Sequence, residues 1–221
     1  IIYVLAWLAL TGTGWLTWAP MMYAWVLMPL AELFISPDNK NLTAAEEELV
    51  KKDRIYDYLL YIIVILQFAA LYIFLTSMKT NNLLWWETAG RICSMGLLCG
   101  TFGINVAHEL GHRVNKYEQL MAKSLLLTSP YMHFFIEHNK GHHKNVATPE
   151  DPSSARLNEP VFIFYFRTII FSYISAWKIA NSELKKKGLP VLHFKNEMLQ
   201  VQIIQFLFVT AIILLFGWMI T

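Results

Sequence analysis

Long apolar runs separated by short polar segments make up most of this chain. A helix needs about 20 mainly apolar residues to cross a hydrocarbon core of about 30 Å, and the longer runs reach that length. The pattern therefore predicts an all-α integral membrane protein with about five membrane-spanning helices, the first of them incomplete. The predicted spans are Ile1–Leu10, Trp15–Ile35, Tyr56–Ser77, Trp85–Ala107 and Met198–Ile220.

Shorter polar segments connect these spans. Thr11–Gly14 contains two glycines and is predicted to form a tight turn. Pro20 and Pro29 are expected to bend the span that follows this turn, because proline lacks the amide hydrogen that a helix interior needs. Ser36–Arg54 is polar and loop-like, with a short helix expected at Ala44–Lys52.

Two further apolar segments do not have the pattern of simple spans. Tyr117–Ile136 includes Lys123 and Pro130, and Val161–Ala180 includes two basic residues. We interpret both segments as interfacial or re-entrant helices, because this arrangement keeps the clustered histidines described below on one face of the membrane.

The basic residues are distributed unevenly around this predicted topology. Of the 18 Lys and Arg residues, only Lys79 and Arg91 lie on the side opposite the histidines. Basic loops are enriched on the cytoplasmic side of membranes, so we predict that the histidine side is cytoplasmic. The connection Lys79–Leu84 then faces the opposite side. Arg91, near the start of its span, is expected to extend its side chain outward to the interface.

Composition supports a membrane protein and argues against some other classes. Hydrophobic residues make up 56% of the chain and charged residues 15%, against roughly 25% charged in soluble domains. The net charge is only +2 and the basic residues are not interleaved with aromatic ones, so no nucleic-acid partner is expected. Cys93 and Cys99 lie in an apolar stretch and are interpreted as packing residues. The chain begins and ends inside apolar runs, and we expect it to be a fragment of a longer protein.

Histidine is concentrated in two short stretches. Five of the seven histidines lie in His108-Glu-Leu-Gly-His112 and in His138-Asn-Lys-Gly-His142-His143. Imidazole is the commonest metal ligand in proteins near neutral pH, and ionisable groups beside membrane spans are functional by default. The sequence therefore predicts a metal site at the membrane surface, formed by these five side chains.

The spacing within each stretch favours ligation. On an α-helix, residues four apart are separated by about 40° around the axis, so His108 and His112 share a face, as do His138 and His142. His143 then lies about 140° from His138 and is expected to reach a second metal. Five imidazoles exceed the needs of one tetrahedral site, and the simplest interpretation is two metals sharing a nitrogen-rich ligand set.

The first stretch also fits the H-E-x-x-H pattern of zinc proteases, in which Glu109 would be the general base. Such a protease needs one further ligand rather than a second histidine cluster, so this alternative is the weaker one. Glu109 and Glu137 each adjoin a cluster, and they either orient ligand rings, bind metal or remain solvated charges. The two remaining histidines, His133 and His193, are interpreted as polar packing residues, with His133 also a candidate for orienting a ligand.

The residues around the clusters resemble those of a known enzyme family. Asn105–Arg113 is similar to the first histidine box of the membrane-bound alkane monooxygenases, Phe134–His143 to their second box, and Val146–Arg156 to the run that follows. Desaturases and sterol-type hydroxylases share the general histidine-box pattern, but their second boxes are typically shorter. Here three residues separate the first two histidines of the second box.

This resemblance extends over essentially the whole chain, and it implies a function. The five clustered histidines would hold two non-haem Fe, and an n-alkane would be hydroxylated to the 1-alkanol with O₂ and with electrons from rubredoxin and its reductase. The fold would be a single membrane-embedded domain over residues 1–221, truncated at both ends, with six membrane helices in the full-length protein and with the boxes on cytoplasmic or interfacial helices. Further histidine motifs would lie beyond Thr221. The location would be the bacterial inner membrane.

The physical chemistry of an alkane agrees with a membrane enzyme. Such a substrate offers no charge or hydrogen bond, so only shape and apolar burial hold it, at about 0.8 kcal/mol per buried CH₂. We expect the second, third and fourth spans to form the wall of its channel. A fatty-acyl desaturase, or another histidine-box oxygenase, would keep the metal ligands and change the product. A histidine-rich metal transporter would instead place its ligands within a span.

Overall fold

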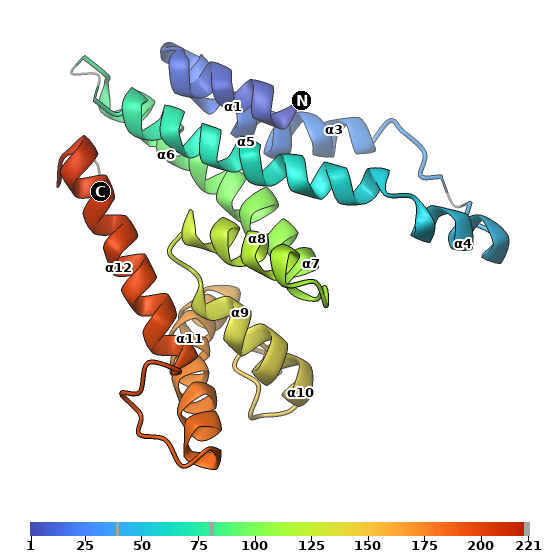
Figure 1. Ribbon diagram of the computed structural model, residues 1–221. Helices are drawn as coiled ribbons and strands as arrows, with labels where there is room; N and C mark the ends of the chain where they lie inside the picture. Colours follow the sequence, from blue (N-terminus) through green and yellow to red (C-terminus); the bar gives the residue numbers. More distant parts are fainter. Residues whose placement is uncertain (39, 80–81, 219–221) are drawn as a thin grey trace. The chain divides into compact units, whose positions relative to one another are not determined.

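The computed structural model describes residues 1–38, 40–79 and 82–218 (Figure 1). All regular structure in these three ranges is helical, and they contain no strand, which confirms the all-α class. The chain divides into two compact units, the first formed by Ile1–Val106 and the second beginning at Ala107.

In the first unit, α1 packs against both α5 and α6 (Figure 1). The short helix predicted in the polar loop is present as α4, and Thr43 and Glu46 form a capping box at its start. The elements of this unit are α1 (Ile2–Thr11), a 3₁₀ turn (Gly14–Trp18), α2 (Ala19–Met22), a π-turn (Tyr23–Leu27), α3 (Met28–Glu32), α4 (Ala44–Lys52), α5 (Ile55–Ser77), α6 (Trp85–Leu98) and a π-helical segment (Cys99–Ile104).

Among the described residues, two helices are long and apolar enough to cross a membrane, by length and composition. These are α5, with 23 residues, and α12 (Glu197–Phe216) of the second unit, with 20 residues. Only 17% and 6% of their most apolar windows are buried inside the protein, so most of their apolar surface faces outward. An extensive exposed apolar surface suits lipid better than water.

The second predicted span is helical but composite. It begins as a 3₁₀ turn at Gly14, where φ is +63°, and it continues through α2, the π-turn and α3 to Glu32. Pro20 and Pro29 each stand at the first or second position of a short α-helix, where a missing amide hydrogen costs least. The expected disturbance by the two prolines therefore takes the form of changes in helix type.

The fourth predicted span is a helix that changes type midway. α6 passes into the π-helical segment at Cys99, and this segment passes directly into α7 (Asn105–Gly111). A polar chain of side chains reaches the start of the π-helical segment: Tyr3 donates to Gln67 Oε1 at 3.0 Å, and Gln67 Nε2 donates to Cys99 Sγ at 3.5 Å. The thiol of Cys99 is thus a hydrogen-bond partner as well as a packing group.

Arg91 does not extend to the membrane interface, so that prediction was wrong. Its side chain is buried, where Nη1 donates to the Ser77 carbonyl and Nη2 to the Gly12 carbonyl, both at 2.7 Å. These two carbonyls lie at the ends of α5 and α1, where helix carbonyls lack intrahelical partners and carry the negative end of the helix dipole. One buried cation therefore caps two helices.

The second unit packs α9 and α12 against α11, with α8 beside α9 (Figure 1). Its predicted helix Tyr117–Ile136 is broken near Pro130, and the one predicted at Val161–Ala180 is longer than expected. Gly217, with φ of +94°, follows the end of α12, and the predicted end of that span at Ile220 lies outside the described residues. The elements are α7, α8 (Lys116–Leu127), α9 (His133–Glu137), a π-turn (His138–His142), α10 (His143–Asn145), α11 (Val161–Lys186) and α12.

Two glycines of α6 offer a test of the packing in the first unit. A Cβ added at Gly90 would lie 2.5 Å from Thr17 Oγ1 and 2.8 Å from Trp18 Nε1, whereas one added at Gly96 would meet nothing within 4 Å. We expect Gly90→Ala to destabilise the protein by about 1–3 kcal/mol through overpacking. Gly96→Ala should be neutral or slightly stabilising, because alanine favours helix.

The measurement is the thermal unfolding midpoint of the full-length protein in detergent, with the two alanine variants side by side. Equal midpoints for the two variants would contradict the close approach of α6 to the 3₁₀ turn.

Candidate metal centre

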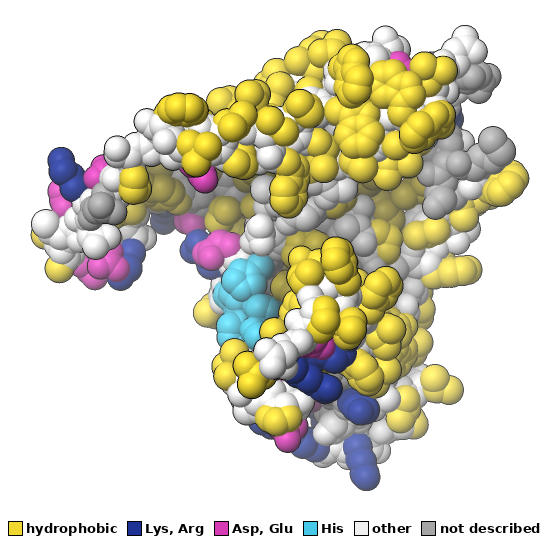
Figure 2. Space-filling model, turned by 180° about the vertical axis from the view of Figure 1, so that it is seen from behind, with side chains coloured by type: hydrophobic (Ala, Val, Ile, Leu, Met, Phe, Trp, Pro, Cys, Tyr) yellow, Lys and Arg dark blue, Asp and Glu magenta, His cyan; other side chains and the backbone are white. Residues whose placement is uncertain are grey.

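Four imidazole rings converge in the second unit. The Nε2 atom of His112 lies 3.1 Å from that of His108 and 3.3 Å from that of His138, and the Nε2 atom of His143 lies 3.0 Å from that of His138. One nitrogen from each of the four rings lies within 4.8 Å of all the others. Figure 2 shows the histidine side chains as one patch at the surface.

The spacing of these nitrogens fits a single metal ion. Ligand nitrogens about 2.0–2.1 Å from a tetrahedral metal are about 3.3 Å apart, and the three Nε2–Nε2 distances given above are close to this value. Neutral imidazoles packed ring against ring have little reason to direct four Nε2 atoms at one point unless a cation lies there. The four rings therefore form a nitrogen-rich donor set that could hold a first-row transition metal.

α7 positions the first pair of rings as the sequence predicted. His108 and His112 are one turn apart on the same face, and their ring centroids are 4.5 Å apart in an edge-to-face arrangement. Leu110, on the opposite side of the helix, and Gly111, at the edge of the histidine face, are both buried. Gly111 lies opposite Phe135, whose ring would be 3.5 Å from an added Cβ.

The second pair of rings differs from the prediction, because residues His138–His142 form a π-turn instead of an α-helix. The i→i+5 hydrogen bonds of a π-turn bring residues five apart onto one face. His143 therefore lies beside His138, with ring centroids 4.6 Å apart, and the expectation that the two rings would diverge was wrong. His138 also stacks on Phe134 at 4.7 Å, which fixes the plane of its ring.

The environment of His138 and of His112 favours the neutral form of each ring. Burial, followed by the neighbouring histidines, lowers the pKa of His138 to about 3. Burial and the rings of His108 and His143 also lower the pKa of His112. A metal binds imidazole only in its neutral form, so these two lowered pKa values favour ligation.

The fifth predicted ligand, His142, lies outside the group of four. Its ring stacks on His138, with centroids 5.2 Å apart, and its Nδ1 atom lies 2.9 Å from Asp151 Oδ2. When a carboxylate accepts the Nδ1 hydrogen, the lone pair of the ring is left on Nε2. This carboxylate–histidine pair is typical of metal ligands and gives His142 the tautomer of a ligand.

Asp151 was not among the residues predicted from the sequence. It is 2% exposed and accepts hydrogen bonds from the Ser154 hydroxyl at 2.6 Å and from the Ser153 amide at 2.9 Å. Burial by itself would raise the pKa of its carboxyl, but these hydrogen bonds and His142 outweigh burial, and the pKa is lowered. Its position within Val146–Arg156, the run that follows the second box, was the available signal.

The three predicted orienting residues have different surroundings. Glu109 is exposed and pairs with Arg113 at 3.0 Å, an arrangement of small energetic value at a surface. Glu137 is 3% exposed; burial, followed by Asp151, raises the pKa of its carboxyl, and Oε1 has no hydrogen-bond partner. His133 is buried against Tyr131 and Tyr173, and burial lowers its pKa to about 4.

His193 lies in the loop before α12, away from the cluster in sequence and in contacts. It stacks on Phe194 with centroids 4.4 Å apart, and its Nδ1 atom accepts the Lys195 amide hydrogen at 3.1 Å. These local contacts agree with its interpretation as a packing residue.

A model of the fatty acid desaturase family matches residues 84–221, which include both histidine boxes and more than half of the chain. The chain belongs to this family. The four clustered histidines lie within the matched residues. The family and the cluster together imply a non-haem metal centre.

Several curated relatives share this region. An alkane 1-monooxygenase of Pseudomonas putida is 35% identical over 213 residues, which are 96% of this chain and 52% of the relative. Alkane 1-monooxygenase 1 of Alcanivorax borkumensis is 34% identical over 93% of this chain and 51% of its own length. The xylene/toluene monooxygenase hydroxylase component of Pseudomonas putida is 28% identical over 52% of this chain and 31% of its own length.

These matches confirm the predicted resemblance to the alkane monooxygenases. The chain spans about half the length of the curated relatives it matches.

In this member of the desaturase family, a further ion-pair network fixes the second box. Lys140, inside the π-turn, lies 3.0 Å from Glu183 Oε1 and 2.8 Å from Glu197 Oε2, and Lys123 lies 3.0 Å from Glu197 Oε1. Burial alone would lower the pKa of Lys140, but the hydrogen bonds to Glu197 and Glu183 outweigh it and raise the pKa. The box sequence gave no signal for this network, because its carboxylates lie on α11 and α12.

Asp151 and its neighbour Glu150 provide a matched pair for a metal-binding test. Replacing Asp151 by Asn should lower the affinity of the full-length protein for metal by about 10–100-fold, the usual cost of losing a carboxylate that orients a ligand histidine. Glu150 is exposed, so Glu150→Gln should leave the affinity unchanged. Chelator competition followed by elemental analysis measures both variants, and an equal loss in the two would show that general charge, not orientation of His142, is responsible.

Proposed function

We propose that the full-length protein is an O₂-dependent monooxygenase that converts medium-chain n-alkanes to 1-alkanols at a non-haem di-iron centre, with electrons from rubredoxin and its reductase. The observation that carries this proposal is the cluster of four Nε2 atoms. Relatives at 35% identity that are named alkane 1-monooxygenase support the choice of reaction.

The ligands divide into two groups in this proposal. His108, His112, His138 and His143 hold one iron, because their nitrogens already lie at the spacing of a single site. His142, with its tautomer fixed by Asp151, belongs to the second iron. Iron bound at such a site would supply activation of O₂ for insertion of one oxygen atom into a C–H bond.

An apolar groove in the first unit supports a hydrocarbon substrate. It has a volume of about 450 Å³ and lies between Trp25 and one helical face, which bears Gly96 of α6, Gly100 and Thr101 of the π-helical segment, and Asn105 at the start of α7. The two glycines leave the helix backbone bare, since an added Cβ at either would meet nothing within 4 Å. A flexible alkyl chain is held by shape and apolar burial alone, and a groove of this kind provides both.

The proposed location is the bacterial inner membrane. The two long apolar helices support insertion, and we propose that the other predicted spans cross the membrane as well, giving five spans in one membrane-embedded domain. The bias of Lys and Arg toward the histidine side supports a cytoplasmic position for both boxes.

A desaturase remains the second candidate, because the matching family model is that of fatty acid desaturases. The same metal site would then remove two hydrogen atoms from neighbouring carbons of an acyl chain. The product distinguishes the two functions.

Substitution of the histidines tests the ligand assignment. In the full-length protein, alanine at His108, His112, His138 or His143 should abolish turnover and remove the iron of the cluster. His142→Ala should abolish turnover and retain part of the iron. Elemental analysis beside activity measures both, and His193→Ala is the control. Loss of turnover with His193→Ala but not with His112→Ala would contradict the assignment.

The reaction itself is tested with octane and labelled O₂ in the presence of rubredoxin and its reductase. We expect labelled 1-octanol by gas chromatography with mass detection. A terminal product requires shape to override intrinsic reactivity, because a methyl C–H bond is stronger than the methylene C–H bonds behind it. Octene would favour the desaturase, and secondary alcohols would contradict the proposed selectivity for the terminal carbon.

A further inference from the structure

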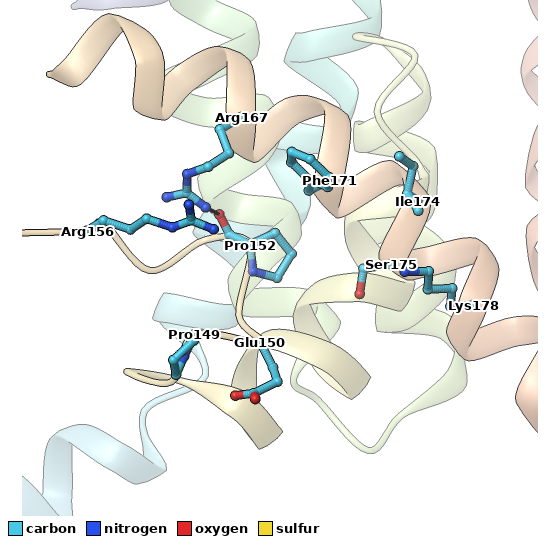
Figure 3. Close-up of a pocket in the computed structure, with 9 residues that line it drawn as sticks. All are labelled: Pro149, Glu150, Pro152, Arg156, Arg167, Phe171, Ile174, Ser175 and Lys178. Carbon is cyan, nitrogen blue, oxygen red and sulfur yellow. Dashed lines mark hydrogen bonds between the residues drawn. The ribbon is translucent and has the colours of Figure 1, made fainter. Parts of the chain in front are cut away.

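A second kind of pocket lies in the second unit, between the loop after the second box and α11 (Figure 3). Its volume is about 200 Å³. Arg156 and Arg167 lie at one end and Lys178 at the other, with Phe171 and Ile174 between them along α11. The pocket therefore combines positive charge with apolar walls.

Two of the three cations are available to a ligand. Neither Arg156 nor Lys178 makes a hydrogen bond or ion pair through its side chain to any described residue, and both are exposed. Arg156 contributes to the lowered pKa of Glu159, but its guanidinium makes no direct ion pair with that carboxylate. Exposed cations of this kind beside a pocket favour an anionic ligand.

Arg167 has a different task. Its guanidinium is bonded to both oxygens of Glu159 and to the carbonyls of Pro152 and Ser154. This clamp holds the loop against α11, so Arg167 builds the pocket wall and its charge is already neutralised by Glu159.

The remaining charges match a monoanion. Arg156 and Lys178 contribute two positive charges and Glu150, at the rim, contributes one negative charge, which leaves one net positive charge. A phosphodiester carries a single negative charge and several acceptor oxygens that a guanidinium can bind.

The apolar residues beside the pocket indicate that the ligand also carries a hydrocarbon part. Ile163, Ile170 and Ile174 follow each other at helical spacing on the side of α11 that bears the pocket, and they are 58%, 54% and 39% exposed. An acidic protein surface would leave this apolar stripe uncovered, whereas an acyl chain would lie along it.

We propose that this pocket binds the phosphate of an anionic phospholipid, with an acyl chain along the exposed isoleucine stripe of α11. Arg156 and Lys178 bind the phosphate, and Phe171 and Ile174 contact the glycerol and the first methylenes. The site is separate from the hydroxylation chemistry and does not depend on it. It would anchor the loop that carries Asp151, the partner of His142, to the membrane surface.

Native mass spectrometry of the full-length protein in neutral detergent tests the site, by titration with dioleoyl phosphatidylglycerol and dioleoyl phosphatidylcholine. We expect one phosphatidylglycerol to bind more tightly than phosphatidylcholine. Each cation near an anionic lipid contributes roughly fivefold, so Arg156→Gln with Lys178→Gln should weaken binding by about 25-fold. Glu150→Gln should strengthen it, because it removes the opposing charge.

The matched control is Lys185→Gln with Lys186→Gln, which removes two exposed charges from the last turn of α11. An equal loss in this control, or equal binding of the two lipids by the wild type, would overturn the proposal. Displacement of the lipid by millimolar inorganic phosphate would assign the pocket to free phosphate, and tighter binding of oleate would assign it to a carboxylate. Either result would also overturn it.

A measurement on the wild type alone guards against misfolded variants. Phosphatidylglycerol with a photoreactive group near the glycerol should crosslink to peptides containing Phe171–Lys178 or Pro149–Arg156. Crosslinks confined to other peptides would refute the site. Retention of lipid only after an acidic protein is added would also refute it.

Discussion

The convergence of four imidazole rings depends on one departure from regular helix geometry, the π-turn at His138–His142. In an uninterrupted α-helix, His138 and His143 would point about 140° apart, and only three of the four nitrogens could meet. The π-turn places both rings on one face, with their Nε2 atoms 3.0 Å apart. π-turns are rare in proteins as a whole, but those that occur are often found at functional sites. They persist only where surrounding contacts hold them.

Those contacts come from α11 and α12. Lys140 lies within the turn and pairs with Glu183 and Glu197, so the widened turn is tied to both long helices. Gly141 makes the packing possible, since an added Cβ would lie 2.6 Å from Glu137 Oε1 and 3.0 Å from Ile179 Cδ1.

Lys140 and Gly141, two of the three residues between His138 and His142, therefore have structural tasks. One is an anchor and the other permits close packing.

The sequence was sufficient for some of these features and not for others. The third span agrees with α5 to within a residue, and the spacing of His108 and His112 led directly to their shared face, because both rest on regular α-helix periodicity. The π-turn could not be predicted, since no local residue signal sets it apart from an α-helix and distant partners stabilise it. The same holds for Asp151, whose role depends on how the loop folds back onto His142.

Arg91 illustrates the limit of rules for single residues. The side chain of an arginine near the end of an apolar span is expected to extend to the aqueous interface. The side chain of Arg91 does not, because the ends of two helices supply buried carbonyl acceptors. The information needed was the relative position of α1 and α5, which the chain around Arg91 does not contain.

The buried polar groups near the start of α6 determine which face of this helix lines the groove. Glu87 accepts the amide hydrogens of Gly14 and Leu84, and Arg91 binds the ends of α1 and α5. Gly90 between them lets Thr17 approach α6 closely. These bonds fix the rotation of α6 about its axis, because polar groups buried in apolar surroundings are costly to leave unpaired.

Fixing the rotation of α6 also fixes which of its faces lines the groove. The face with Gly96 and Gly100 is held opposite Trp25, although neither glycine makes a polar contact itself. A saturated hydrocarbon gives a protein nothing to recognise except shape. The polar interactions that hold the bare backbone of the groove in position therefore lie a few turns away from it, where they would not meet the proposed alkane.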